Sequence, residues 1–225
     1  MAREFKWDEK TQRYRVTSGA GKGQFITKEA ITTLEEKAIA ASGSVITKYN
    51  KKLAKDEISL QEWQTGIVTE LRDLHLQAYA LGAGGWENLT KRDYANIKKT
   101  LDSEMKFFEA FSKEIADGKL SNAQIEARSQ MYANKLHSVM ENGRLASHKK
   151  AGYKTESRHR TVTESCSECI QYESTGIVEI GTLPNPGEAC SCRSNCKCYK
   201  QYYKTEKGQD LLNTLGSNGL FLRYG

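Results

Sequence analysis

Proline is nearly absent from this chain of 225 residues: there are only two, Pro184 and Pro186, and both stand in one short segment. Because proline disrupts helix interiors, the long stretch before them is free to form uninterrupted helices. Cysteine is also absent from the first 165 residues, and all six thiols lie within residues 166–198. The sequence therefore predicts a long helical part, followed by a short part rich in thiols and turns.

Long apolar runs are missing as well. No window approaches the roughly 18 consecutive apolar residues that a membrane-spanning helix needs. Residues 1–7 contain no apolar run of the kind that directs secretion. We therefore expect a protein without membrane contact that works in a reducing compartment, where disulfides are rare.

Recognised catalytic patterns are a third absence. The sequence contains no H-E-x-x-H motif, no paired-carboxylate motif, and no nucleophile spaced from a base in a recognised way. We therefore expect no enzymatic activity and assign no catalytic residue.

The thiols themselves form a pattern that suits a metal. The chain reads C-S-E-C, then twenty residues, then C-S-C-R-S-N-C-K-C. Two close-spaced pairs separated by a loop are typical of one tetrahedral zinc ion, because each pair can present both sulfurs to the same ion. Disulfides and free or redox-active thiols are the alternatives. The expected ligands are Cys166, Cys169, Cys196 and Cys198, with Cys190 and Cys192 as alternates.

Positive charge is concentrated just before the first thiol pair. The formal net charge is +6, and residues 144–160 hold six cations against one acid, Glu156. Such a run favours contact with a polyanion or an acidic protein surface, although a solvated face is the common alternative. The candidate contact residues are Arg144, Lys149, Lys150, Lys154, Arg158 and Arg160.

The long first part shows helical periodicity. Apolar residues recur every three or four positions, most regularly from Leu60 to Leu81, and this spacing places them on one helix face. Helix starts are predicted at Thr27, at Thr90 with Asp93, and at two capping boxes, in which a hydroxyl and a carboxylate or amide satisfy free backbone N–H groups. These boxes are Ser59 with Glu62 and Ser121 with Gln124. The fourth helix is expected to run from Ser121 to about Ser147.

Short loops between long amphipathic helices make an antiparallel bundle the expected architecture. The fold class is therefore mainly α: an antiparallel helical bundle with an N-terminal β-hairpin and a small C-terminal zinc-binding module of mixed α, β and loop structure. The expected divisions are an N-terminal hairpin or arm (1–27), the helical domain (28–150), the cysteine module (151–204) and a docking tail (205–225).

The order of these parts resembles a known family. A helical region is followed by basic residues, C-x-x-C, the loop Leu-Pro-Asn-Pro-Gly at 183–187 and the closing Asn-Cys-Lys-Cys at 195–198. This resembles the C-terminal signature of phage head morphogenesis or minor capsid proteins of the Mu F type, over residues 144–199. The family usually has a histidine shortly before the closing cysteines. Here Cys192 and Arg193 occupy that neighbourhood, which leaves the second ligand pair open.

The resemblance implies a structural virion protein, present in a few copies at or near the portal or head–tail vertex, that assists head assembly. Its implied partners are other virion proteins (portal, capsid or connector subunits) and the packaged DNA. It would be found in the virion, and in the host cytoplasm during assembly. The alternative is a zinc-ribbon regulator that binds nucleic acid. The basic run holds only one aromatic residue, Tyr153, so a base-stacking platform is not evident.

Overall fold

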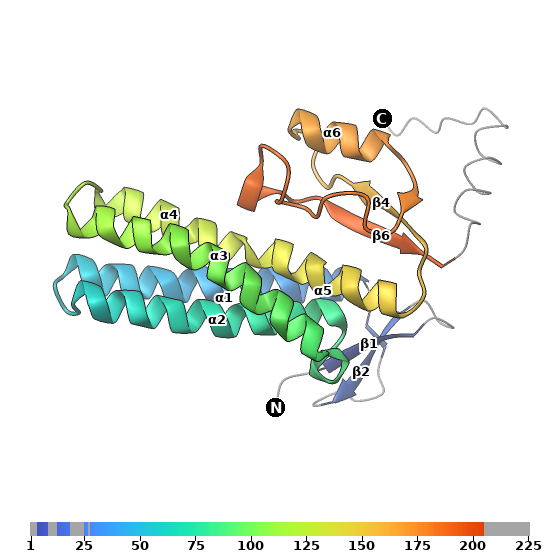
Figure 1. Ribbon diagram of the computed structural model, residues 1–225, viewed down its shortest axis with the longest axis horizontal. Coiled ribbons are helices and arrows are strands. Elements are labelled where there is room, and N and C mark those ends of the chain that lie inside the picture. Colours follow the sequence, from blue (N-terminus) through green and yellow to red (C-terminus); the bar gives the residue numbers. More distant parts are fainter. Residues whose placement is uncertain (1–3, 9–12, 19–24, 27, 205–225) are drawn as a thin grey trace. The chain divides into compact units, whose positions relative to one another are not determined.

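The computed structural model describes residues 4–8, 13–18, 25–26 and 28–204, and their side chains from Glu36 onward. The described chain is mainly helical, with small antiparallel sheets (Figure 1). It also holds a cysteine cluster in its C-terminal part. It divides into two compact units, Met1–Arg144 and Leu145–Gly225, which are described separately below. The expected docking tail, residues 205–225, and the expected cap, Thr27, lie outside the described residues.

Helices make up most of the first unit, and their starts agree with the sequence. Ser59, Thr90 and Ser121 are confirmed as N-caps, each accepting a hydrogen bond from the backbone N–H three residues on and each completed by a reciprocal side chain. Satisfying these free donors stabilises each start by about 1 kcal/mol. The long helices are α1 (Lys28–Ala54), α2 (Leu60–Ala83), α3 (Lys91–Ala116), α4 (Asn122–Asn134) and α5 (Leu136–Lys150).

The single fourth helix expected from Ser121 to Ser147 is wrong in one respect, because it is divided at Lys135 into α4 and α5. The backbone N–H of Lys135 is shared between the carbonyls of Met131, Tyr132 and Ala133 instead of pointing at one acceptor. Shared bonds of this kind tighten a turn toward 3₁₀ geometry and interrupt the regular ladder. Apolar periodicity continues across the break, so it did not reveal the interruption.

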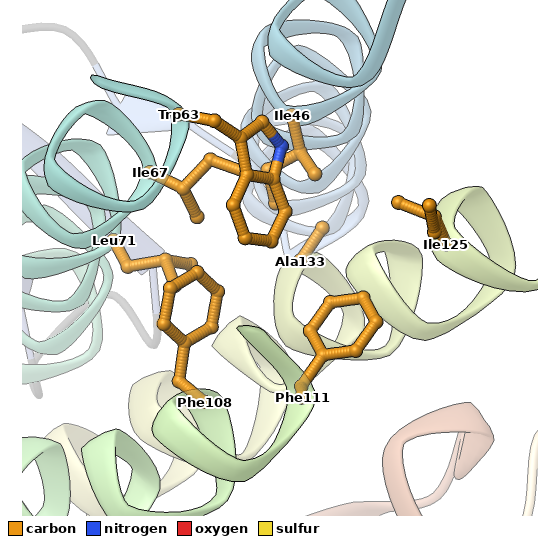
Figure 2. Close-up of a cluster of buried hydrophobic side chains, with 8 residues drawn as sticks. All are labelled: Ile46, Trp63, Ile67, Leu71, Phe108, Phe111, Ile125 and Ala133. Carbon is orange, nitrogen blue, oxygen red and sulfur yellow. The ribbon is translucent and has the colours of Figure 1, made fainter. Parts of the chain in front are cut away.

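The core of this unit is aromatic and draws on four helices. Trp63 of α2 stacks on Phe108 of α3 at a centroid separation of 5.3 Å, and Phe111 meets both rings edge-on (Figure 2). The indole N–H of Trp63 donates to Asn50 Oδ1 at 2.9 Å, so its one polar atom is satisfied inside the core. The clustered residues are Ile46, Trp63, Ile67, Leu71, Phe108, Phe111, Ile125 and Ala133. The stripe predicted on α2 therefore does face the core.

Glycines allow the helices to approach closely. A Cβ on Gly82 of α2 would lie 2.0 Å from the carbonyl oxygen of Met140, and one on Gly143 would lie 2.3 Å from that of Tyr79. Gly43 of α1 lies against the end of the Gln130 side chain of α4, which is a more adaptable neighbour than backbone. The helix-weakening effect expected of glycine is thus offset by packing that no larger residue permits.

A histidine and a glutamate meet inside this unit. His75 of α2 is fully buried and Glu104 of α3 is nearly so, and Nε2 of the histidine lies 3.2 Å from Oε2 of the glutamate without hydrogen-bond alignment. Burial, with the nearby Lys135 charge, lowers the pKa of His75 to about 4. Burial also raises the pKa of Glu104 to about 7, against the opposing charge of Lys135. Both groups are therefore held toward their neutral forms.

Separating the pair should expose two opposite pH dependences. In H75Q only Glu104 remains, and its raised pKa gives stability that is complete below pH 4.5 and lost as the pH rises to about 7. In E104Q only His75 remains, and its lowered pKa gives stability that is complete above pH 6.5 and lost as the pH falls to about 4. Across each of these pH ranges the free energy of unfolding should change by ~3 kcal/mol. Denaturant unfolding from pH 4 to pH 7 measures both slopes.

The matched control is E109Q, which removes an exposed glutamate from the same helix and should leave the wild-type profile unchanged. In the wild type the two slopes oppose each other and largely cancel between pH 4.5 and 6.5. Reversed slopes, with H75Q gaining stability and E104Q losing stability as the pH rises, would show that the remaining group is held in its charged form instead.

Strands occur at both ends of the described chain. In the first unit, β1 (Glu4–Asp8), β2 (Arg13–Ser18) and β3 (Phe25–Ile26) pair antiparallel in that order. In the second, β4 (Thr155–His159) is the central strand, with β5 (Val178–Glu179) and β6 (Tyr199–Tyr203) antiparallel on its two sides. A short helix, α6 (Ser167–Ser174), and two 3₁₀ turns, η1 (Trp86–Asn88) and η2 (Arg193–Asn195), complete the elements. Among the described helices, none is long and apolar enough to cross a membrane.

Candidate metal centre

The second unit brings its thiols together from three chain segments. Cys166 is the N-cap residue of α6, and Cys169 lies in the first turn of that helix. Cys190 and Cys192 precede the turn η2, and Cys196 and Cys198 follow it and lead into β6. Because β6 pairs with β4 along its whole length, the closing cysteines are held at a defined position relative to that sheet.

The six sulfurs form one cluster with the spacing of metal ligands. None of the six cysteines is in a disulfide, and they fall into two sets within which every sulfur lies within 4.8 Å of the others. One set is Cys166, Cys169, Cys190 and Cys192, and the other is Cys169, Cys196 and Cys198. Two thiolates on one tetrahedral zinc are about 3.8 Å apart, given Zn–S bonds of about 2.3 Å. The cluster could therefore hold a metal ion.

The ligand choice predicted from the sequence differs from this grouping. The pair Cys166 and Cys169 lies with Cys190 and Cys192, which were the alternates, in the set of four. The expected second pair, Cys196 and Cys198, joins the cluster through Cys169. Spacing along the chain could not distinguish these cases, because the turns around η2 decide which sulfurs face Cys169.

Arg158 is the residue of this site that sequence reasoning placed elsewhere. It was assigned to an exposed basic surface, but it is fully buried. Its Nη2 lies 3.4 Å from the sulfur of Cys169, 3.7 Å from that of Cys190 and 3.3 Å from that of Cys196. The neighbouring β4 residues Glu156 and Ser157 are buried as well, so this part of the strand lies inside the unit. The assignment of Arg158 as a solvent-facing polyanion contact is therefore corrected.

The guanidinium is held firmly in this position. Its Nη1 donates to the carbonyl of Pro184 at 3.1 Å, and its plane lies over the ring of Tyr172 at 4.8 Å. Burial alone would lower the pKa of Arg158, but the sulfurs of Cys196, Cys169 and Cys198 raise it above its usual value. A buried cation of this kind needs anionic neighbours, and thiolates provide them.

The pKa of the Cys196 thiol is well below its usual value. The hydrogen bond from Cys198, together with the positive charge of Arg158, lowers the pKa of Cys196 to about 4 against the opposing effect of burial. The thiolate is the form that binds metal. Cys196 can therefore enter coordination at neutral pH without first releasing a proton.

A buried ion pair supports the loop whose Pro184 carbonyl accepts a hydrogen bond from Arg158. Lys200 of β6 lies 3.1 Å from Glu156 of β4, and both side chains are fully buried. Glu156 accepts the backbone N–H of Leu183 at 2.9 Å, and the Lys200 amine donates to the carbonyl of the same residue. The pair thus joins two strands to the start of the Leu-Pro-Asn-Pro-Gly loop, next to the carbonyl that Arg158 uses.

The other predicted contact residues do not share one environment. Lys149, Lys150 and Lys154 are exposed. Arg160 is bonded to Glu173 of α6, by its backbone N–H at 2.9 Å and by its guanidinium. Arg144 belongs to the first unit, where it donates to the buried Glu141 at 2.6 Å. Of the six predicted contact residues, Lys149, Lys150 and Lys154 are therefore the exposed ones.

A serine and a histidine also meet on β4. Ser157 Oγ lies 2.7 Å from His159 Nε2 and 3.0 Å from the hydroxyl of Tyr203. A nucleophile must reach its substrate, and Ser157 is only 4% exposed. We therefore read these contacts as structural. The i, i+2 spacing places Ser157 and His159 on one face of β4, and the contact of Ser157 with Tyr203 ties β4 to β6.

The chemistry of the second unit is thus dominated by sulfur. Its donor set is six cysteines, and Arg158 is the charged side chain that contacts three of them. No family model matches the chain, and no curated protein or solved structure matches it either.

Proposed function

We propose that the cysteine cluster is a structural zinc site and that the chain is an assembly protein of a phage head. The observation that carries this proposal is the cluster itself, which joins α6, the segment around η2 and the start of β6 through sulfur ligands alone. Closed sulfur sites are typical of structural zinc, whereas catalytic zinc keeps a position for water. The metal would hold together a unit that has few apolar residues of its own.

Zinc is favoured by the ligand type. Thiolate ligands in a tetrahedral arrangement suit zinc or an iron–sulfur cluster, and zinc needs no redox partner. The burial of Cys169, Cys190, Cys196 and Cys198 suits an ion that is kept rather than exchanged. Zinc-loaded protein would be colourless, whereas an iron–sulfur cluster absorbs visible light.

The helical unit is proposed as the scaffold of the assembly. We infer an antiparallel bundle from the shared core, to which α1, α2, α3 and α4 each contribute residues. The N-terminal strands are proposed to form the hairpin arm predicted from the sequence. With the resemblance over residues 144–199, these parts support a minor capsid or head morphogenesis role near the portal or head–tail vertex.

The partners proposed are other virion subunits and the packaged DNA. Lys149, Lys150 and Lys154 are the exposed cations that would meet an acidic surface or phosphates. Contacts of this kind are strongly salt-dependent, because bound cations release counterions from DNA. The same lysines also support the second candidate, a zinc-ribbon regulator that binds nucleic acid in the cytoplasm.

Mass spectrometry of purified phage particles separates the two candidates. An assembly protein is expected to co-purify with the particles at a fixed ratio to the portal subunit, and to withstand a high-salt wash. A regulator would stay in the cell lysate and be absent from washed particles. Absence from particles would therefore overturn the virion proposal, whatever metal the protein contains.

A further inference from the structure

The two thiol sets overlap at a single residue, Cys169. We propose that the cluster binds two metal ions, which share the thiolate of Cys169 as a bridge. This proposal rests on the proposed zinc site and extends it, because a single ion would leave at least two of the six thiols unused. The ion of the first set would be held by Cys166, Cys169, Cys190 and Cys192, and that of the second by Cys169, Cys196 and Cys198.

The distances around Cys169 support a bridge. Its sulfur lies 4.0 Å from that of Cys192 in the first set and 3.7 Å from that of Cys196 in the second. Both values are close to the roughly 3.8 Å that separates two sulfurs on one tetrahedral zinc. Cys169 is fully buried, so its sulfur is surrounded by the other thiols rather than by water.

Arg158 lies where the two sets meet. Its Nη2 contacts Cys190 of the first set, Cys196 of the second, and the shared Cys169. Six thiolates carry more negative charge than two divalent ions neutralise, so a shared cluster is anionic and is stabilised by a buried cation. Among the described residues, Arg158 has no carboxylate within ion-pair distance, which leaves the sulfurs as its counter-charge.

The second set differs from the first in a way that can be measured. It supplies three thiols instead of four, so its ion has one coordination position that these residues do not fill. Cys196 and Cys198 are nonetheless buried, at 2% and 3% exposure, which shields this ion from solvent. We expect it to be the more weakly bound of the two and the first that a chelator removes.

Native mass spectrometry of the full chain, purified with zinc in slight excess, counts the ions. The expected result is two zinc ions per chain. Cys198→Ser should retain one, because the four-thiol set is intact. Cadmium-substituted protein should give two NMR resonances of equal area, and Cys198→Ser should remove one of them. The control is Lys197→Ser, which places the same residue at an exposed neighbouring position and should retain two ions.

The possible outcomes separate this inference from the zinc site on which it rests. One ion in the wild type, retained or lost in Cys198→Ser, overturns the shared cluster but leaves a zinc site standing. No ion in the wild type overturns both. Two ions in both proteins would show that Cys198 is not a ligand, and would overturn the assignment of the second set.

Discussion

Replacing Cys169 with serine is expected to weaken the binding of every zinc ion in the cluster and to unfold the second unit, while the helical signal of the first unit persists. Cys169 belongs to both thiol sets and is fully buried, so its loss removes a ligand from every arrangement that the cluster allows. Structural zinc contributes about 10–16 kcal/mol to the folding of small zinc modules. A loss of this size is comparable to the total stability of an ordinary domain, about 5–15 kcal/mol.

Hydrogen exchange resolves the two units separately and is the appropriate measurement. Amides of β4 and β6 should lose their protection in Cys169→Ser, and those of α2 and α3 should keep theirs. Ile170→Ser is the matched control, because it introduces the same residue at the next position, where the side chain is 47% exposed. Retained protection of β4 in zinc-free Cys169→Ser would show that the second unit folds without metal, and that metal binding is not what stabilises it.

Replacing Lys200 with methionine is expected to destabilise the second unit by about 3–5 kcal/mol. The change leaves Glu156 buried and charged, with its remaining hydrogen bond to the backbone N–H of Leu183. Removing both charges in Glu156→Leu/Lys200→Met should recover part of the loss, because an apolar pair leaves no unpaired buried charge. The recovery is incomplete because the N–H and carbonyl of Leu183 lose these side-chain partners. The double-mutant cycle then gives the coupling between the two residues.

Hydrogen exchange of the β4 and β6 amides gives the free energy of opening of this unit. It is measured at one fixed concentration of free zinc for the wild type, the two single variants and the double variant. Lys197→Met is the control, since it removes an exposed lysine three residues away and should change the free energy by less than about 0.5 kcal/mol. An effect of Lys200→Met as small as that of the control would mean that the ion pair does not stabilise this unit.

Local signals were well predicted by the sequence, because they depend on residues three or four positions apart. The caps at Ser59, Thr90 and Ser121 satisfy backbone groups within one turn, so their spacing is sufficient to place helix starts. The stripe through Trp63, Ile67 and Leu71 faces the core for the same reason. The thiol-rich segment was also recognisable, since close cysteine spacing is itself the signal.

Other features depend on which distant segments meet. The break at Lys135 follows from how its N–H is shared, which apolar periodicity does not encode. The meeting of His75 with Glu104 requires α2 and α3 to pack with these residues facing each other. Lys200 and Glu156 are 44 positions apart and become partners because β4 and β6 are paired.

The sequence by itself determined a helical chain with capped starts, a late cluster of six thiols, and a basic run before it. Only the tertiary structure decided how those thiols are grouped, with Cys169 common to both sets. It also decided that Arg158 lies inside the site instead of on the basic surface. The physical reason is that charge and spacing are properties of the chain, whereas burial and coordination depend on which segments the fold brings together.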